Sequence, residues 1–134
     1  MYSSQNQFSS NAKKPALSRE ARLSWIGSKL AQSVCADTDR LDDLHHRLWM
    51  RRLQEGLAPV PLRDEIDRLA SEILDVAILV ERVASNDGAE AAMAAVKLAS
   101  GQGIDPALAD RFLHLGSALV FWAALDADRN YEKN

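Results

Sequence analysis

The sequence has few residues that interrupt helices and few that form covalent or metal cross-links. Among 134 residues there are six glycines and four prolines, so long uninterrupted helices are possible. The single cysteine, Cys35, excludes an internal disulfide and a four-cysteine zinc site, and it fits a reducing cytoplasm. The polar N-terminus has no apolar run, so we expect no secretory signal peptide and a cytoplasmic protein.

Acidic and basic residues are nearly balanced over the whole chain. The formal net charge is −3, which argues against a protein that binds nucleic acid with its whole surface. The first 36 residues nevertheless carry five basic and one acidic side chain, and residues 37–134 carry eleven basic and eighteen acidic ones. A basic arm on an acidic body can attract an acidic partner, although a solvated arm without a partner explains the same distribution.

The composition divides the chain into a tail and one domain. Hydrophobic residues make up 47% of the sequence and charged residues 26%, a balance typical of globular proteins. Residues 1–15 are instead rich in serine, asparagine and glutamine, and we expect them to form a disordered polar tail. Residues 16–134 contain no strand pattern, and we predict that they form a single all-α domain.

One apolar stripe runs through the first half of this domain. At about 100° per residue its members fall within an arc of about 80°, and they are Leu23, Ile26, Leu30, Val34, Leu41, Leu44 and Leu48. We predict one long helix from Ser18 to about Glu55, with a break near Thr38 as the alternative. At 1.5 Å per residue this helix would be about 57 Å long. A monomer of this size would not cover it, so we expect a homodimer.

Two shorter helical segments are expected to follow. The first begins after Pro61 and carries a seven-residue apolar repeat that ends at Val83. The second is rich in alanine and follows a turn, and we predict that Asp87 and Glu90 form its capping box. Together with the long helix and a last helix, these segments would form a helical bundle.

The last helix is predicted to start at Asp105, with the proline that follows at its first position. Beyond Gly116 it is apolar on nearly all sides, but its apolar stretch is shorter than the roughly 20 residues that a membrane span needs. We therefore expect no membrane segment. The large side chains of this stretch are predicted to pack in the core or in a dimer interface, and they include Leu119, Phe121 and Trp122.

No arrangement of residues is specific for catalysis or for metal binding. Asp42 shares a helix face with His45 and His46, but a di-iron bundle needs two such motifs and further carboxylates. We interpret these three residues as solvated charge pairs on a helix surface. Cys35 has no adjacent histidine or lysine that would lower its pKa, and no nucleophile motif is present. We expect no enzyme, no metal and no cofactor.

One basic cluster lies within the acidic part of the chain. It consists of Arg47, Arg51 and Arg52 with the two neighbouring histidines. Acidic residues interrupt the cluster, so it does not form a continuous strip that could follow phosphates. We predict an exposed face on which the arginines form salt bridges, and we do not expect it to bind nucleic acid.

Several large side chains of the predicted long helix lie outside its apolar stripe. Trp25 and Met50 fall nearly opposite the stripe, and Trp49 lies at its shoulder. Tryptophan, methionine and arginine are enriched where proteins contact one another. We predict a partner-binding surface formed by Trp25, Trp49, Met50 and Leu53. In the alternative interpretation, other helices of the same chain wrap this helix from two sides.

Residues 62–69, which read LRDEIDRL, resemble the start of the first helix of the all-helical chorismate mutases. In this resemblance Arg63 matches the first substrate-binding arginine of that family. Val80 stands at the position of the second arginine, and Leu119 and Ala123 stand at the positions of a serine and a glutamine. The resemblance therefore implies a similar helical architecture without the mutase activity, because the groups that stabilise the transition state are missing.

The polar tail, the long first helix with its off-stripe aromatic residues and the apolar last helix together resemble the QslA-like proteins, small all-helical antiactivators of LuxR-type quorum-sensing receptors. This resemblance implies a dimer that binds the ligand-binding domain of the receptor and disrupts the receptor's dimerisation. We predict a non-enzymatic regulatory protein that inhibits a transcriptional regulator. The alternatives are a small enzyme of chorismate-mutase-like architecture and a DNA-associated accessory protein, whose binding would weaken steeply with salt.

Overall fold

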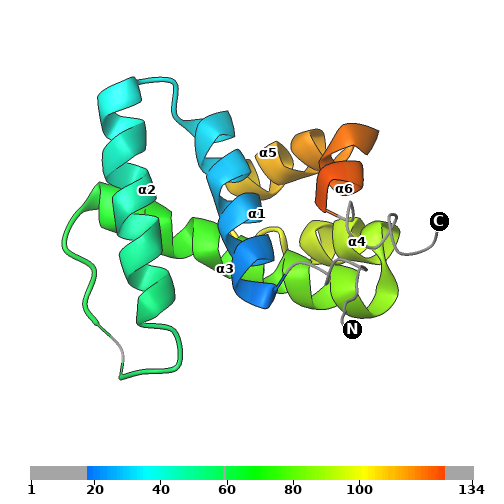
Figure 1. Cartoon of the computed structure of the whole chain (residues 1–134), viewed down its shortest axis with the longest axis horizontal. Coiled ribbons are helices and arrows are strands. Elements are labelled where there is room, and N and C mark those ends of the chain that lie inside the picture. The colour runs from blue at the N-terminus through cyan, green and yellow to red at the C-terminus, as the bar shows by residue number, and fades with distance from the viewer. Residues whose placement is uncertain (1–17, 59, 126–134) are drawn as a thin grey trace, which may run out of the picture.

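A computed structural model describes residues 18–58 and 60–125, and these ranges fold into six helices without a strand (Figure 1). The predicted all-α class is therefore confirmed. The expected tail, residues 1–15, lies outside the described ranges. The helices are α1 (Arg19–Val34), α2 (Thr38–Leu53), α3 (Glu65–Asp87), α4 (Ala89–Ala99), α5 (Pro106–Gly116) and α6 (Leu119–Leu125).

The predicted long first helix is wrong, and the alternative break near Thr38 is what the structure has. Cys35 is extended, with φ −135° and ψ 112°, and ends α1. The Asp37 carboxylate then accepts hydrogen bonds from the backbone N–H groups of Asp39 and Arg40 and so caps α2. Because the short link preserves the phase of the apolar stripe, periodicity alone does not distinguish this hairpin from a straight helix. The expectation of a dimer from helix length no longer applies.

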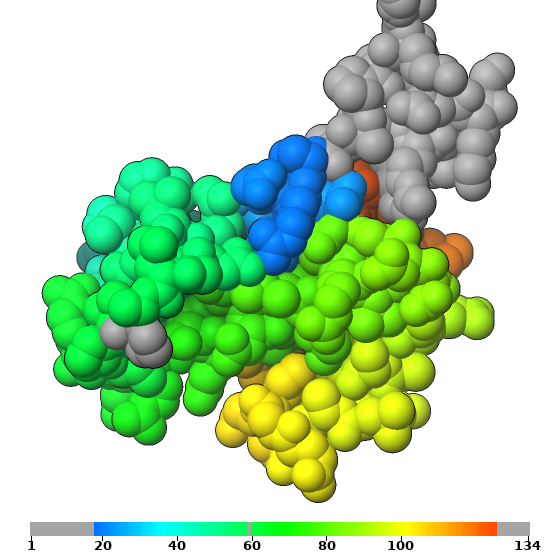
Figure 2. All heavy atoms as spheres, turned by 90° about the horizontal axis from the view of Figure 1, so that it is seen from below, coloured from blue at the N-terminus to red at the C-terminus, as the bar shows by residue number. Residues whose placement is uncertain are grey.

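Helices α1 and α2 pack side by side as an antiparallel pair. Gly27 lies against Leu48, and a Cβ atom on Gly27 would come within 2.8 Å of the Leu48 Cδ2 atom. At the open end of the pair, Arg19 of α1 forms an ion pair of 2.6 Å with Glu55, just after α2. Figure 2 shows this end of α1 lying between the C-terminal part of α2 and α3.

Helix α3 is the central element of the fold and contacts α1, α2 and α4. The Asp64 carboxylate caps it by accepting a hydrogen bond from the Asp67 N–H. In its middle, Ile73, Val76 and Val80 of the predicted apolar repeat are fully buried.

The joint between α3 and α4 differs from the predicted capping box. Helix α3 continues through Asp87, and Gly88 both ends α3 and precedes α4 without any side-chain cap. Gly88 has φ +95°, a conformation that residues with a side chain rarely adopt. The glycine backbone therefore makes the turn, and neither Asp87 nor Glu90 has the predicted role.

The predicted last helix is divided in two, because α5 ends at Gly116 and α6 departs from it at 83°. The Ser117 hydroxyl donates to the His114 carbonyl at 2.7 Å, and the Trp122 indole N–H donates to the Gly116 carbonyl at 2.7 Å. These bonds satisfy carbonyls that a helix end would otherwise leave free. No single helix in the described ranges is long and apolar enough to cross a membrane, and the bent α5–α6 pair meets that test only by length and composition.

The bend returns the aromatic residues of α6 to the core. The Phe112 ring of α5 is fully buried and lies 5.7 Å from the Phe121 ring and 6.3 Å from the Trp122 ring, both nearly perpendicular to it. The Trp25 ring of α1 also contacts Phe121, at a centroid distance of 4.8 Å. We call Trp25, Phe112, Phe121 and Trp122 the aromatic cluster. Edge-to-face pairs of this kind stabilise a fold beyond the area they bury.

Candidate protein-binding surface

Helix α2 has apolar side chains on two opposite sides. Its inner side buries Leu44 and Leu48 against the rest of the fold. Its outer side exposes Trp49, Met50 and Leu53, with 48%, 40% and 52% of their surface accessible. At about 100° per residue these three residues form one stripe. The inner side of α2 already supplies its contact with the core, so packing within the chain does not explain a second apolar stripe of this size.

Trp25, the fourth residue predicted for partner binding, is placed elsewhere. It is only partly exposed, belongs to the aromatic cluster, and has the Lys29 ammonium 5.7 Å from its ring centroid. The structure therefore does not bring Trp25 together with Trp49, Met50 and Leu53. For Trp25 the alternative interpretation holds, since α6 of the same chain covers it.

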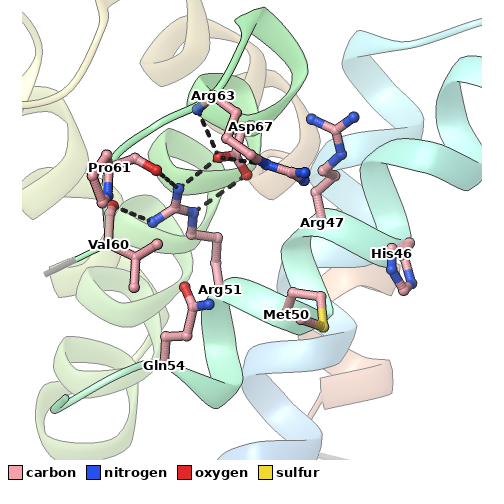
Figure 3. A pocket seen from close by; sticks show the side chains of 9 residues that line it. All are labelled: His46, Arg47, Met50, Arg51, Gln54, Val60, Pro61, Arg63 and Asp67. Atoms are coloured by element: carbon pink, nitrogen blue, oxygen red, sulfur yellow. Dashed lines mark hydrogen bonds and ion pairs between the residues drawn. The ribbon is translucent and has the colours of Figure 1, made fainter. Parts of the chain in front are cut away.

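The loop between α2 and α3 extends the exposed stripe. Val60 is 43% exposed and lines, together with Met50, a hollow with a volume of about 550 Å³ beside α2 (Figure 3). Sequence reasoning missed this contribution, although the loop contains three large apolar residues, Leu57, Val60 and Leu62, all of them exposed. We call Trp49, Met50, Leu53 and Val60 the α2 surface.

Arg51 holds the loop against α2. Its guanidinium donates to the Val60 carbonyl at 2.9 Å, to the Pro61 carbonyl at 3.0 Å and to the Asp67 carboxylate at 2.6 Å (Figure 3). Asp67 also accepts a hydrogen bond from the Arg63 N–H at 3.0 Å. The bond from Arg51 is the main reason why the pKa of Asp67 lies below its ordinary value, against the effect of burial. Together with the bonds to the loop carbonyls, this buried ion pair holds Val60 in position beside α2.

Arg47 forms a second, more exposed set of ion pairs. It bonds Asp43 at 3.2 Å and Asp64 at 2.5 Å. The pKa of Asp64 is lowered by the hydrogen bond from the Asp67 N–H and by Arg47. The predicted salt bridges of an exposed face are therefore present at Arg47, whereas Arg51 pairs with the buried Asp67 and Arg52 has no ion pair within the described ranges.

The residues considered for metal binding and reactivity have local contacts. The His45 Nε2 atom lies 3.4 Å from the Ser28 hydroxyl, the His46 ring lies 6.4 Å from the Trp49 ring, and Asp42 is exposed. The Cys35 thiol donates to the Asp37 carbonyl at 3.6 Å. Within residues 18–58 and 60–125, no group of three histidine, cysteine, aspartate or glutamate side chains could hold a metal ion.

The three residues predicted for core or dimer packing have different environments. Phe121 is buried and Trp122 partly buried, both in the aromatic cluster. Leu119 is 86% exposed and lies next to Val120, which is 74% exposed. The first turn of α6 thus presents a second exposed apolar site.

Comparisons with known proteins give no relative. No protein-family model, no curated protein and no solved structure matches the chain. The residues that align with the active-site positions of the chorismate mutases do not line a common site. Val80 is fully buried, whereas Arg63 and Leu119 are largely exposed. The functional interpretation therefore depends on the residues of the α2 surface themselves.

Proposed function

We propose that this protein is a non-enzymatic regulatory protein that binds and inhibits a partner protein through the α2 surface. The observation that carries the proposal is the outer stripe of Trp49, Met50 and Leu53 on a helix whose inner side is already buried. A large exposed apolar site between charged residues is typical of a protein contact. Tryptophan is also the residue type that most often contributes a large share of binding energy.

The partner class that we propose is a transcriptional regulator of the LuxR type, acting in the cytoplasm. This part of the proposal rests on the resemblance of the sequence to the QslA-like antiactivators. An apolar face of the regulator would cover Trp49, Met50 and Leu53. A face covered in this way is no longer free for the regulator's own dimerisation, so binding alone inhibits it, and the mechanism requires neither catalysis nor a cofactor.

Replacing Trp49 with alanine tests this surface. We expect binding to the purified ligand-binding domain of a LuxR-type receptor to weaken by about thirtyfold, which corresponds to the roughly 2 kcal/mol lost with a buried anchor residue. The helical circular dichroism signal should not change, because nearly half of the Trp49 surface is exposed in the free protein. Isothermal titration of both proteins gives the two affinities.

Leu98→Ala is the matched control, since Leu98 is an exposed apolar residue on α4 outside the α2 surface. It should bind like the wild-type protein. Equal binding by the Trp49→Ala protein would remove the α2 surface from the proposal. Absence of binding by the wild-type protein would remove the LuxR-type regulator as the partner.

We also propose that two copies associate through the first turn of α6. Leu119 and Val120 are the exposed residues concerned, and residues 117–125 contain no charged side chain, so two copies could meet there without repulsion. Analytical ultracentrifugation should show a dimer for the wild-type protein and for Leu57→Asp. It should show a monomer for Leu119→Asp, because a carboxylate would be buried in the interface without a partner. A monomeric wild-type protein would contradict this proposal.

A further inference from the structure

Three exposed carboxylates near the α2 surface, Glu20, Asp39 and Asp42, have no ion pair within the described ranges, but four others are already engaged in ion pairs. Each of these four lies within 4.0 Å of an arginine of the same chain, and two of these arginines belong to α2 itself. The pairs are Glu55 with Arg19, Asp43 and Asp64 with Arg47, and Asp67 with Arg51. Their negative charge is therefore largely neutralised before any partner arrives.

Two arginines at the same surface are not neutralised to this extent. Arg52 borders the groove between α1 and α2 together with Trp49, and within the described ranges it has no ion pair and no hydrogen bond. The Arg63 side chain is 71% exposed, and its Nε atom lies 3.9 Å from Asp67, which is already bonded to Arg51. Each flank of the stripe therefore presents one cation that is not fully neutralised.

These two arginines lie on opposite sides of the apolar stripe. Arg52 belongs to the side of α2 that faces α1, where it lines a hollow of about 220 Å³. Arg63 belongs to the side that faces the loop, where it lines the larger hollow with Met50 (Figure 3). An apolar stripe with a cation on each flank complements an apolar stripe with an anion on each flank.

A buried polar atom in the larger hollow also points to an occupant. The Oε1 atom of Gln54 is buried and has no hydrogen-bond partner within the described residues. Gln54 lines the same hollow as Met50 and Arg63 (Figure 3). A buried acceptor without a donor costs free energy, and a donor from a bound segment would remove that cost once the Gln54 side chain turns toward the hollow.

We propose that the α2 surface binds an amphipathic helix of the partner whose apolar stripe carries aspartate or glutamate on both flanks. The stripe packs on Trp49, Met50 and Leu53, and the carboxylates pair with Arg52 on one side and Arg63 on the other. This inference rests on the proposed function and adds the chemistry of the partner. A helix laid in a groove by its apolar face is a common mode of peptide recognition.

An anionic lipid surface is a less suitable occupant for the same residues. It would meet not only the two arginines but also the exposed carboxylates of Glu20, Asp39 and Asp42, which have no ion pair within the described ranges. A flat sheet of negative charge would be repelled by these groups, whereas the separate carboxylates of a helix can be placed at the arginines alone.

Three synthetic helical peptides test the proposal on the full chain. Each has about 18 residues, or five turns, with the same leucine stripe, and the stripe is flanked by glutamate, glutamine or lysine. Fluorescence anisotropy of the labelled peptides gives their affinities. We expect the glutamate peptide to bind about tenfold more tightly than the glutamine peptide, and the lysine peptide to bind most weakly. This preference should shrink between about 50 and 300 mM salt, because the flanking charges are exposed.

Charge reversal of the flanks should reverse the preference. In the variant with Arg52→Glu and Arg63→Glu, the lysine peptide should bind most tightly. The variant with Arg82→Glu and Arg111→Glu has the same net charge and changes exposed residues of α3 and α5, and it should keep the wild-type order. Trp49→Ala should weaken all three peptides by a similar factor, because it removes apolar contact that they share.

The outcomes separate this inference from the proposed function. If all three peptides bind equally and Trp49→Ala weakens them, the acidic flanks are wrong and the α2 surface remains a protein-binding site. If no peptide binds, or if Trp49→Ala changes nothing, both proposals are wrong. If the protein floats with phosphatidylglycerol vesicles through Arg52 and Arg63 and shows no preference among the peptides, a lipid surface replaces the acidic helix.

Discussion

Replacing Phe112 with alanine is expected to lower the free energy of unfolding by about 4 kcal/mol. Phe112 is fully buried, and its ring is the common neighbour of Phe121 and Trp122. The substitution removes the transfer free energy of the ring, leaves a cavity, and takes away the edge-to-face contacts that hold α6 on α5. Urea denaturation followed by tryptophan fluorescence measures the loss.

Phe112→Leu is the matched control for this prediction. It keeps an apolar side chain of similar length, so we expect it to cost about half as much or less. A loss below about 1.5 kcal/mol for Phe112→Ala would show that the site collapses around the smaller side chain. In that case the aromatic cluster would not be what fixes the bend between α5 and α6.

Replacing Arg51 with methionine is expected to lower the free energy of unfolding by about 3 kcal/mol. Asp67 is 6% exposed and would be left as a buried carboxylate without its main partner. The loop would also lose the two hydrogen bonds from Arg51 to the carbonyls of Val60 and Pro61. Chemical denaturation at neutral pH gives the loss.

The pH dependence of the same variant identifies the ion pair as the cause. In the folded protein the pKa of Asp67 lies below its ordinary value of 3.8, first because of the hydrogen bond from Arg51. The unfolded chain therefore takes up a proton at this group before the folded one does as the pH falls, and the wild-type protein loses stability below about pH 4. The Arg51→Met variant lacks this interaction. The difference in free energy of unfolding between wild type and variant should therefore become smaller as the pH falls below about 4.

Arg47→Met is the control for Arg51→Met. The Asp43 and Asp64 carboxylates that pair with Arg47 are 46% and 50% exposed, and water screens such pairs. We expect a loss below about 1 kcal/mol. Equal losses for the two variants, or a constant difference between wild type and Arg51→Met from neutral to acid pH, would contradict the role assigned to the Arg51–Asp67 pair.

Predictions from the sequence were correct where a short run of neighbouring residues is compatible with only one local structure. The Asp105-Pro106 pair predicted the start of α5, and the Asp105 carboxylate accepts a hydrogen bond from the Leu108 N–H as expected of an N-cap. The seven-residue apolar repeat after Pro61 likewise predicted a helix, which is α3. These signals depend on neighbouring residues only, so no knowledge of the tertiary structure is needed.

The predictions were wrong where two arrangements share one local pattern. A straight helix and the α1–α2 hairpin have the same apolar periodicity, and only packing distinguishes them. Similarly, Asp87 could have capped α4, but Gly88 makes the turn with its backbone instead. Trp25 and Trp49 are both off the predicted stripe, yet Trp25 lies against Phe121 while Trp49 is exposed.

The sequence by itself determined that the described part of the chain is all-helical, that Asp105 caps α5, and that α2 carries more large apolar residues than its core-facing side needs. Only the tertiary structure decided which of the large apolar residues stay exposed, because the chain reverses after Val34 and bends by 83° after Gly116. The reversal turns the second stripe of α2 outward, and the bend brings α6 over Trp25. Periodicity describes one helix at a time, whereas exposure depends on which helices meet.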